Sequence, residues 1–118
     1  MKPEEAAVFE GSEAVVRHTY DAVMRIVLKF GPVEIDAKTN SIHLIAGSVF
    51  AIAHPRKTAL SLSIRTDKPL ASTRVTKVNA ISRNVVHNEI LLAAPGAVDR
   101  ELTAWLKAAY ALGANKTA

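Results

Sequence analysis

Five basic side chains in the middle of the sequence have the chemistry to bind an anion. They are Arg56, Lys57, Arg65, Arg74 and Arg83. A guanidinium offers a planar fork of N–H donors to phosphate or carboxylate, and lysine adds a compact positive charge. Residues 38–83 hold eight bases and one acid, a net charge of +7, whereas the whole chain carries +4. This concentration of charge favours an anionic partner; the alternative is a solvated rim that serves solubility.

The aromatic residues narrow the class of ligand. Phe50 is the only aromatic residue between positions 31 and 104, so recognition of single strands by base stacking is disfavoured. A small anionic ligand, a nucleic-acid duplex backbone and an acidic partner protein remain as alternatives. We therefore predict a non-catalytic binding module whose ligand-binding residues are the five bases above.

A second pattern resembles half of a magnesium nuclease motif. Asp36 and Lys38 lie two residues apart, so on a strand they share a face, and Glu34 shares it with them. In such enzymes carboxylates hold the metal and a lysine orients the attacking water. The alternative function is therefore a metal-dependent phosphodiester hydrolase that uses Glu34, Asp36 and Lys38. The simpler interpretation is a wet strand face that ends in a turn.

The histidines give only a weak signal for a metal centre. The chain has four histidines: His18, His43, His54 and His87. None of them has the HxH, HxxxH or HExxH spacing of metal ligands, although Glu89 shares a strand face with His87. The chain has no cysteine, which removes disulfides, thiolate metal sites and cysteine nucleophiles. No GxSxG elbow or ordered triad exists. We expect no catalytic residue, no metal and no cofactor.

The elements that must position these residues follow from hydrophobic periodicity. A helix is predicted from the N-cap Ser12 to about residue 30, where Gly31 and Pro32 end it. A C-terminal helix is predicted after the capping residue Asp99 and ends at Gly113. Alternation predicts strands over residues 33–38, 42–45, 49–54, 60–65 and 85–93, whereas residues 1–11 form a lead-in and 74–81 are ambiguous.

This order of elements predicts the fold class. Short connections favour antiparallel pairing, and two helices can cover one face of the sheet. We predict an α+β, two-layer fold with an N-terminal helix, four to five mainly antiparallel strands and a C-terminal helix. The other face is left for water, a ligand or a second subunit. Small residues at 59, 61 and 63 alternate with leucines, so a homodimer through their face is one hypothesis, and a plain wet face is the other.

Length and composition limit the remaining choices. The 118 residues have 49 % hydrophobic and 22 % charged side chains, which is typical of one globular domain. We expect a single domain over residues 1–118, with a structured core at about 9–112. No apolar stretch approaches the roughly 20 residues of a membrane span, so we expect no membrane insertion. The start of the chain is unlike a signal peptide, and the absence of cysteine fits a cytoplasmic location.

The last strand and helix resemble a known family. His87, residues 89–92, Asp99 and the pairs at 101–102, 105–106 and 109–110 are similar to the end of the bacterial domain-of-unknown-function family five-six-five-five. Upstream segments at 9–11, 31–33 and 55–57 agree with it, so the resemblance runs from about Phe9 to Tyr110. It implies the fold and carries over no activity, cofactor or catalytic residue. Some members are labelled predicted transport proteins, and others accompany nuclease-like or restriction-associated proteins; the second context is compatible with the basic centre.

Overall fold

The computed structural model describes residues 2–115, which form a single antiparallel sheet with helices packed on one side. The helices are α1 (Pro3–Ala7), α2 (Ala14–Val27), α3 (Arg100–Asn115) and a short 3-10 helix, η1 (Pro95–Ala97). The strands are β1 (Glu34–Ala37), β2 (Ile42–Ala46), β3 (Ser48–Pro55), β4 (Leu60–Thr66), β5 (Val75–Ser82) and β6 (Val85–Leu92). The chain is therefore an α+β domain, as the order of the patterns predicts.

The strands follow the order β1-β2-β3-β4-β6-β5 across the sheet. Hairpins join the first four strands in turn, and every neighbouring pair is antiparallel. The loop over residues 67–74 then carries the chain past the place of β6 to the outer edge, where β5 begins. As a result β6 returns between β4 and β5, and β5 is an edge strand.

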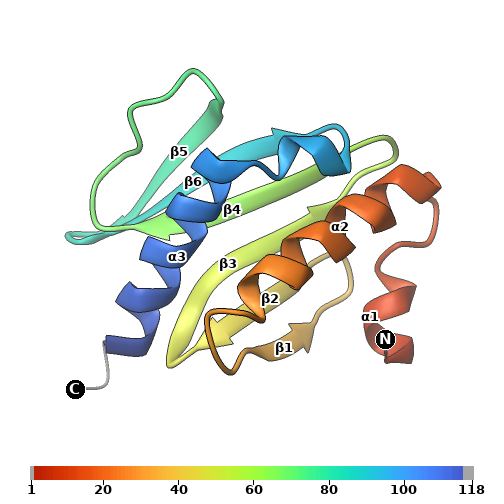
Figure 1. Ribbon diagram of the computed structural model, residues 1–118, viewed down its shortest axis with the longest axis horizontal. Helices are drawn as coiled ribbons and strands as arrows, with labels where there is room; N and C mark the ends of the chain where they lie inside the picture. Colours follow the sequence, from red (N-terminus) through yellow and green to blue (C-terminus); the bar gives the residue numbers. More distant parts are fainter. Residues whose placement is uncertain (1, 116–118) are drawn as a thin grey trace.

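The two long helices cover one face of the sheet and leave the other face free (Figure 1). On β4, Leu60, Leu62 and Ile64 are fully buried beneath them. The buried face of α2 includes Tyr20, and that of α3 includes Leu106. Because side chains alternate along a strand, the residues between these leucines point to the helix-free face.

The start of α3 is fixed by the cap that its sequence predicts. The carboxylate of Asp99 accepts a hydrogen bond from the backbone N–H of Leu102 at 3.0 Å. Such a cap satisfies one of the donors that the first turn of a helix leaves unpaired. Near the other end of α3, the Tyr110 hydroxyl donates to the carbonyl of Pro32 at 2.9 Å and ties the helix to the start of the sheet.

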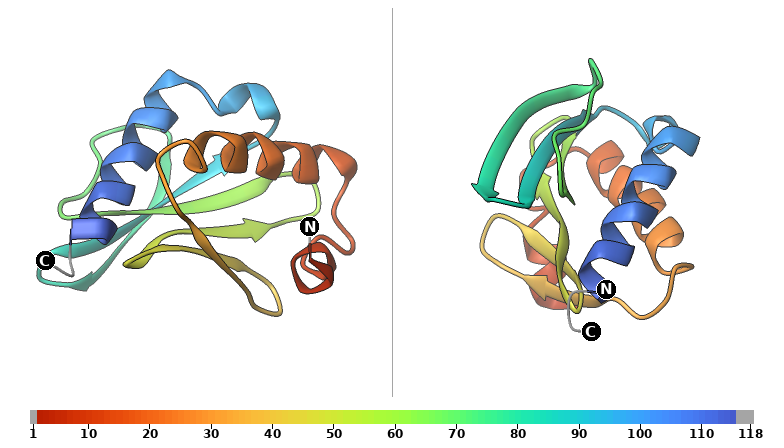
Figure 2. Two further views of the ribbon diagram at one scale, coloured as in Figure 1. Left: turned by 60° about the horizontal axis from the view of Figure 1, so that its bottom comes forward. Right: turned by 90° about the vertical axis from the view of Figure 1, so that its left-hand side faces the viewer.

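The sheet is strongly curved. Figure 2 shows, in its right-hand view, that the β5–β6 and β1–β2 hairpins bend away from the side on which α2 and α3 lie. The helix-free face is therefore the concave one. The burial of side chains agrees, because Ser61 is only 3 % exposed although no helix covers its face.

The β2–β3 turn touches the end of α3 backbone to backbone. Gly47 has φ +74°, which favours glycine, and a Cβ atom built on it would lie 2.4 Å from the carbonyl oxygen of Gly113. A Cβ atom on Gly113 would in turn lie 2.6 Å from the carbonyl oxygen of Ala46. Both glycines are needed for this contact, which places the neighbouring Ser48 at the end of the sheet.

Three predictions made from the sequence need correction. The sheet has six strands instead of four or five, because residues 75–82 form β5. All but the first residue of this edge strand are exposed. Because the strand has no buried face, its sequence shows no clear alternation of apolar and polar residues. Residues 3–7 form α1 instead of a plain lead-in, and the N-cap of α2 is Glu13 instead of Ser12.

The segment around α1 is docked by a buried polar contact. The Tyr20 hydroxyl donates a hydrogen bond to the Glu5 carboxylate, and both side chains are buried. Burial, and then this bond, raise the pKa of Tyr20 above its ordinary range. The Phe9 ring packs on Tyr20 with centroids 5.0 Å apart. None of the helices in the described part of the chain has the length and apolar content that a membrane crossing needs.

Candidate anion site on the helix-free face of the sheet

The five predicted ligand-binding bases do not form one patch. Arg56 and Lys57 lie in the β3–β4 turn, and Arg83 lies in the β5–β6 turn. Because β4 pairs antiparallel with β6 from Leu60↔Leu92 to Thr66↔Val86, these two turns are at opposite ends of the sheet. Arg65 is in β4 between them.

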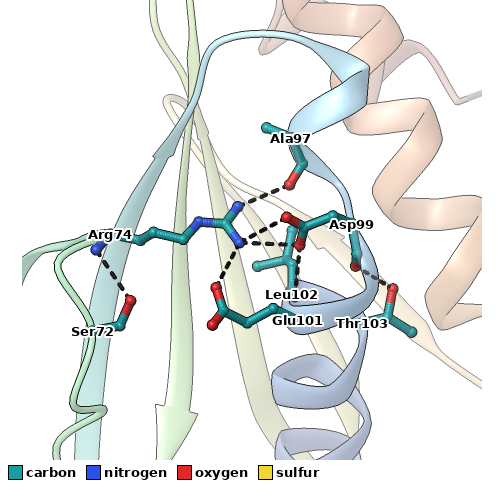
Figure 3. A network of polar contacts seen from close by, with 7 residues as sticks. All are labelled: Ser72, Arg74, Ala97, Asp99, Glu101, Leu102 and Thr103. Carbon is teal, nitrogen blue, oxygen red and sulfur yellow. Dashed lines mark hydrogen bonds and ion pairs between the residues drawn. The ribbon is translucent and has the colours of Figure 1, made fainter.

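Arg74 is engaged by acids of its own chain on the side of α3 (Figure 3). Its Nη1 atom donates to the carboxylates of Asp99 and Glu101, each at 3.0 Å, and its Nη2 atom donates to the carbonyl of Ala97 at 2.9 Å. The guanidinium also lies 5.7 Å from the ring centroid of Trp105. This set of contacts fastens the start of β5 to the η1–α3 segment, so Arg74 has a structural role.

The ionisation of this cluster agrees with that role. Hydrogen bonds to Glu101 and then to Asp99 raise the pKa of Arg74. The backbone N–H of Leu102 and then Arg74 lower the pKa of Asp99. The charged forms are therefore the stable ones, and an external anion would have to displace two carboxylates to reach this guanidinium.

The bases in the turns are exposed and loosely engaged. Arg56 Nη2 lies 3.5 Å from a carboxylate oxygen of Glu89, with more than half of the arginine side chain exposed. Lys57 and Arg83 are exposed as well. The backbone carbonyl of Lys57 accepts a hydrogen bond from the N–H of Glu13, which holds the turn against the start of α2. These three bases can attract an anion at long range, but none forms an enclosed site.

Arg65 has a different environment. Its side chain projects from the helix-free face near the end of β4 and is only 9 % exposed. Nη1 donates to Ser48 Oγ at 2.7 Å, whereas Nε is buried without a hydrogen-bond partner. Among residues 2–115, no carboxylate forms an ion pair with it. Arg65 is thus a buried cation that lacks a counterion.

Two histidines flank Arg65. His87 lies directly opposite it on β6, and the pKa of His87 is lowered, first by burial, then by the Arg65 guanidinium and then by His43. His43 is on β2, three strand spacings from β6, which is about 14 Å in a flat sheet. His43 and His87 lie on the same, concave face of the sheet, and His43 is the last of the three influences that lower the pKa of His87.

The floor between the histidines is small and partly apolar. Ser63 on β4 lies opposite Ile52 on β3, which in turn lies opposite His43. Ser63 and Ile52 are both half-buried. We call the group of Arg65, Ser48, Ser63, His43 and His87 the Arg65 site. It combines one full positive charge, two titratable imidazoles and two hydroxyls, which can all donate hydrogen bonds to an anion.

A buried guanidinium without a counterion is energetically costly. A buried charged group is stable when it is paired and hydrogen-bonded, and leaving a charged donor unsatisfied costs on the order of 1–3 kcal/mol or more. Within residues 2–115, Arg65 Nη1 donates to Ser48 and the buried Nε has no acceptor. An anion against the guanidinium would supply the missing charge and the missing acceptors.

The predicted hydrolase residues lie at the opposite edge of the sheet. Asp36 and Lys38 contact each other, with the carboxylate 2.8 Å from Nζ, and a hydrogen bond from Lys38 lowers the pKa of Asp36. Glu34 lies on the same strand, and a cavity of about 800 Å³ separates β1 from α1. In the described part of the chain, no group of three or more histidine, aspartate and glutamate side chains is arranged to hold a metal ion.

The small-residue face of β4 is not a flat surface. Ser61 and Ser63 lie at the bottom of the curved face, between the side chains of β3 and β6. The hypothesis that a second copy packs here therefore stays a prediction. The same alternation that places these serines together also places Arg65 beside them.

Sequence reasoning missed the partners of Arg65. His43 and His87 draw attention in the sequence only as metal ligands, and Ser48 only as part of a turn. Alternation along β4 and β6 assigns Arg65 and His87 to the wet face of their strands. It contains no signal that the face is concave or that β2 contributes to the same site.

Comparison with protein-family models gave one match. It covers residues 5–113 and is to the family described as "Domain of unknown function (DUF5655)". Comparison with curated proteins gave no match, and neither did comparison with solved structures.

Proposed function

Because the chain belongs to this domain-of-unknown-function family, whose description names no ligand or reaction, we propose a function from the site alone. The domain is a binding module that holds an anionic ligand on the helix-free face of its sheet, with Arg65 as the anchor. This keeps the prediction of an anion-binding module and narrows its site from five dispersed bases to one.

One observation carries the proposal: Arg65 is nine-tenths buried, and no acidic group of the described chain pairs with it. Acids are available nearby, since Glu89 lies on the same face of the adjacent strand. That carboxylate is paired with Arg56 instead. An arginine kept buried without a counterion is the arrangement expected of a group whose partner comes from outside.

The other basic residues have separate parts in this proposal. Arg56, Lys57 and Arg83 are exposed and raise the local concentration of anions, which affects the association rate and its salt dependence. Arg74 is satisfied by Asp99 and Glu101, so we assign it no contact with the ligand. We do not propose the hydrolase alternative, because Asp36 is neutralised by Lys38.

A thermal-shift titration tests the proposal. Inorganic phosphate and sulfate are added to the protein in a zwitterionic buffer of constant ionic strength. At about 100 times its dissociation constant, a ligand adds roughly 2.7 kcal/mol to the free energy of unfolding. We expect this shift for the wild type and for Arg83→Ala, which removes the same charge from an exposed turn, and its loss in Arg65→Met.

The matched variants separate specific binding from general charge effects. A shift that persists in Arg65→Met refutes the assignment of the site. Equal loss in Arg65→Met and Arg83→Ala refutes it too, because only the summed charge would then matter. The pair Arg56→Ala and Lys57→Ala should weaken the salt dependence while the shift remains.

A further inference from the structure

The donors of the Arg65 site lie on four strands of the concave face. Arg65 projects from β4, and His87 lies opposite it on β6. Ser48 on β3 contacts Arg65, and His43 lies on the same face on β2. On the far side of β6, the neutral amide of Asn79 lies opposite His87 on β5. Along β6 itself, the carboxylate of Glu89 lies two residues from His87 on the same face and is paired with Arg56.

Two acidic groups on this face are paired with basic side chains other than Arg65. Asp36, which lies opposite His43 on β1, has its carboxylate 2.8 Å from the ammonium of Lys38. Glu89 lies opposite Lys77 on β5 and pairs with Arg56 at 3.5 Å. Neither carboxylate forms an ion pair with Arg65, and Glu34, the third acid of this face, lies on the edge strand β1. The guanidinium therefore gives the site a positive charge, which grows when an imidazole is protonated.

This balance of charge selects between classes of anion. A carboxylate or a phosphodiester brings one negative charge, which the guanidinium alone matches. A phosphate monoester brings up to two charges and three terminal oxygens, enough to accept hydrogen bonds from several of these donors at once. The second charge has a partner only when one imidazole is positive, and His87 is the imidazole directly beside the guanidinium.

We propose that the ligand of the Arg65 site is a small molecule carrying a phosphate monoester, and that His87 takes up a proton as it binds. This inference rests on the proposed function, because it names the class of anion that Arg65 anchors. A small molecule fits better than a nucleic acid, since Arg65 is only 9 % exposed and, within residues 2–115, no aromatic side chain on this face is available to stack a base.

The proton uptake follows from the electrostatics of the site. Burial, and then Arg65 and His43, keep the pKa of His87 low, so its imidazole is neutral at neutral pH. A dianion beside it reverses the sign of its surroundings and favours the charged form. By linkage, a ligand that raises the protonation of a group binds more tightly as the pH falls.

The experiment uses calorimetric titrations of the whole protein between pH 6 and 8 with three probes: sulfate, phenyl phosphate and benzoate. Sulfate stays a dianion over this range, so any proton taken up on its binding comes from the protein. We expect sulfate and phenyl phosphate to bind at least tenfold more tightly than benzoate. The sulfate dissociation constant should rise by up to tenfold per pH unit, the limit for uptake of one proton.

Variants identify the group that titrates. His87→Gln should bind sulfate with a flat pH profile, whereas His18→Gln, which changes an exposed histidine of α2, should retain the wild-type slope. Thermal melts of both variants check that they are folded. If His87→Gln does not fold, the number of protons taken up by the wild type in buffers of different ionisation enthalpy answers the same question.

The outcomes separate the two proposals. If benzoate binds as tightly as phenyl phosphate, or if the sulfate profile is flat in the wild type, the monoester assignment is wrong while Arg65 can still anchor an anion. If no probe binds, or if Arg65→Met binds them all unchanged, the proposed function itself fails. A 5′-phosphorylated oligonucleotide that binds at least tenfold more tightly than phenyl phosphate would overturn the choice of a small molecule.

Discussion

Replacing Arg65 with methionine is expected to abolish anion binding and yet leave the fold equally stable or more stable. The change removes a buried Nε that has no acceptor, and such a donor costs about 1–3 kcal/mol. It also removes the hydrogen bond to Ser48, which is worth about 1 kcal/mol. Methionine keeps much of the aliphatic stem in place, so the net change is about 1 kcal/mol in favour of folding.

Arg74→Met gives the opposite result and is the matched comparison. It breaks hydrogen bonds to Asp99, Glu101 and the carbonyl of Ala97, and it ends the cation–π contact with Trp105. Both carboxylates are about half exposed, so each pair contributes at the low end of its range. The summed loss is about 2 kcal/mol.

Thermal unfolding monitored by circular dichroism, in a buffer free of phosphate and sulfate, measures the difference. For a domain of this size, 1 kcal/mol corresponds to about 4 °C in Tm. We expect Arg65→Met to melt about 4 °C above the wild type, or level with it, and Arg74→Met to melt about 8 °C below. If Arg65→Met is destabilised as much as Arg74→Met, Arg65 is a structural residue and the anion site has no basis.

Three further outcomes are expected. Gly47→Ala should lower Tm by several degrees, because its Cβ atom would meet the Gly113 carbonyl oxygen at 2.4 Å and its φ is +74°; an unchanged melting curve would show that the turn can move away from α3. Tyr20→Phe should destabilise the fold by about 1–3 kcal/mol, since it leaves the buried Glu5 carboxylate without its donor, and denaturant unfolding measures this loss. The backbone N–H that Asp99 caps is the first cause that lowers the pKa of this carboxyl group. Asp99 therefore stabilises the fold at pH values above its unfolded pKa of about 3.9. This contribution is lost as the pH falls through the folded pKa. Acid unfolding of Asp99→Asn should therefore be flatter below about pH 4 than that of the wild type, and identical curves would contradict the cap.

The parts of the fold that periodicity could predict are those with a buried face on a regular element. The alternation of Leu60, Leu62 and Ile64 predicts β4, and Asp99 predicts the start of α3, and the structure confirms both. The alternation fails for residues 75–82, because an exposed edge strand has no buried face to select for apolar side chains. The predicted ends of helices also differ from the observed ones by a residue or so: α2 starts at Ala14, after the N-cap Glu13, instead of after Ser12.

For the candidate site, the sequence could predict that basic residues are involved, but it could not predict which of them form the site. Composition identifies a basic middle segment, but it gives the same weight to Arg65 and to Arg74. What separates them is burial and the position of acids that are distant in sequence, such as Asp99 and Glu101 for Arg74. The curvature that makes this face concave is a property of the whole sheet, and no local pattern in the chain encodes it.

The contact between the β2–β3 turn and the end of α3 has a consequence for how binding is transmitted through the chain. Ser48 holds the guanidinium of Arg65 at 2.7 Å, and a Cβ atom on Gly113 would lie 3.5 Å from the same Ser48 hydroxyl oxygen. An anion that fixes Arg65 therefore also restrains the turn on which the last turn of α3 rests. Local opening of α3 at this end becomes thermodynamically linked to occupancy of the site, and hydrogen exchange of its terminal amides would slow as the ligand binds.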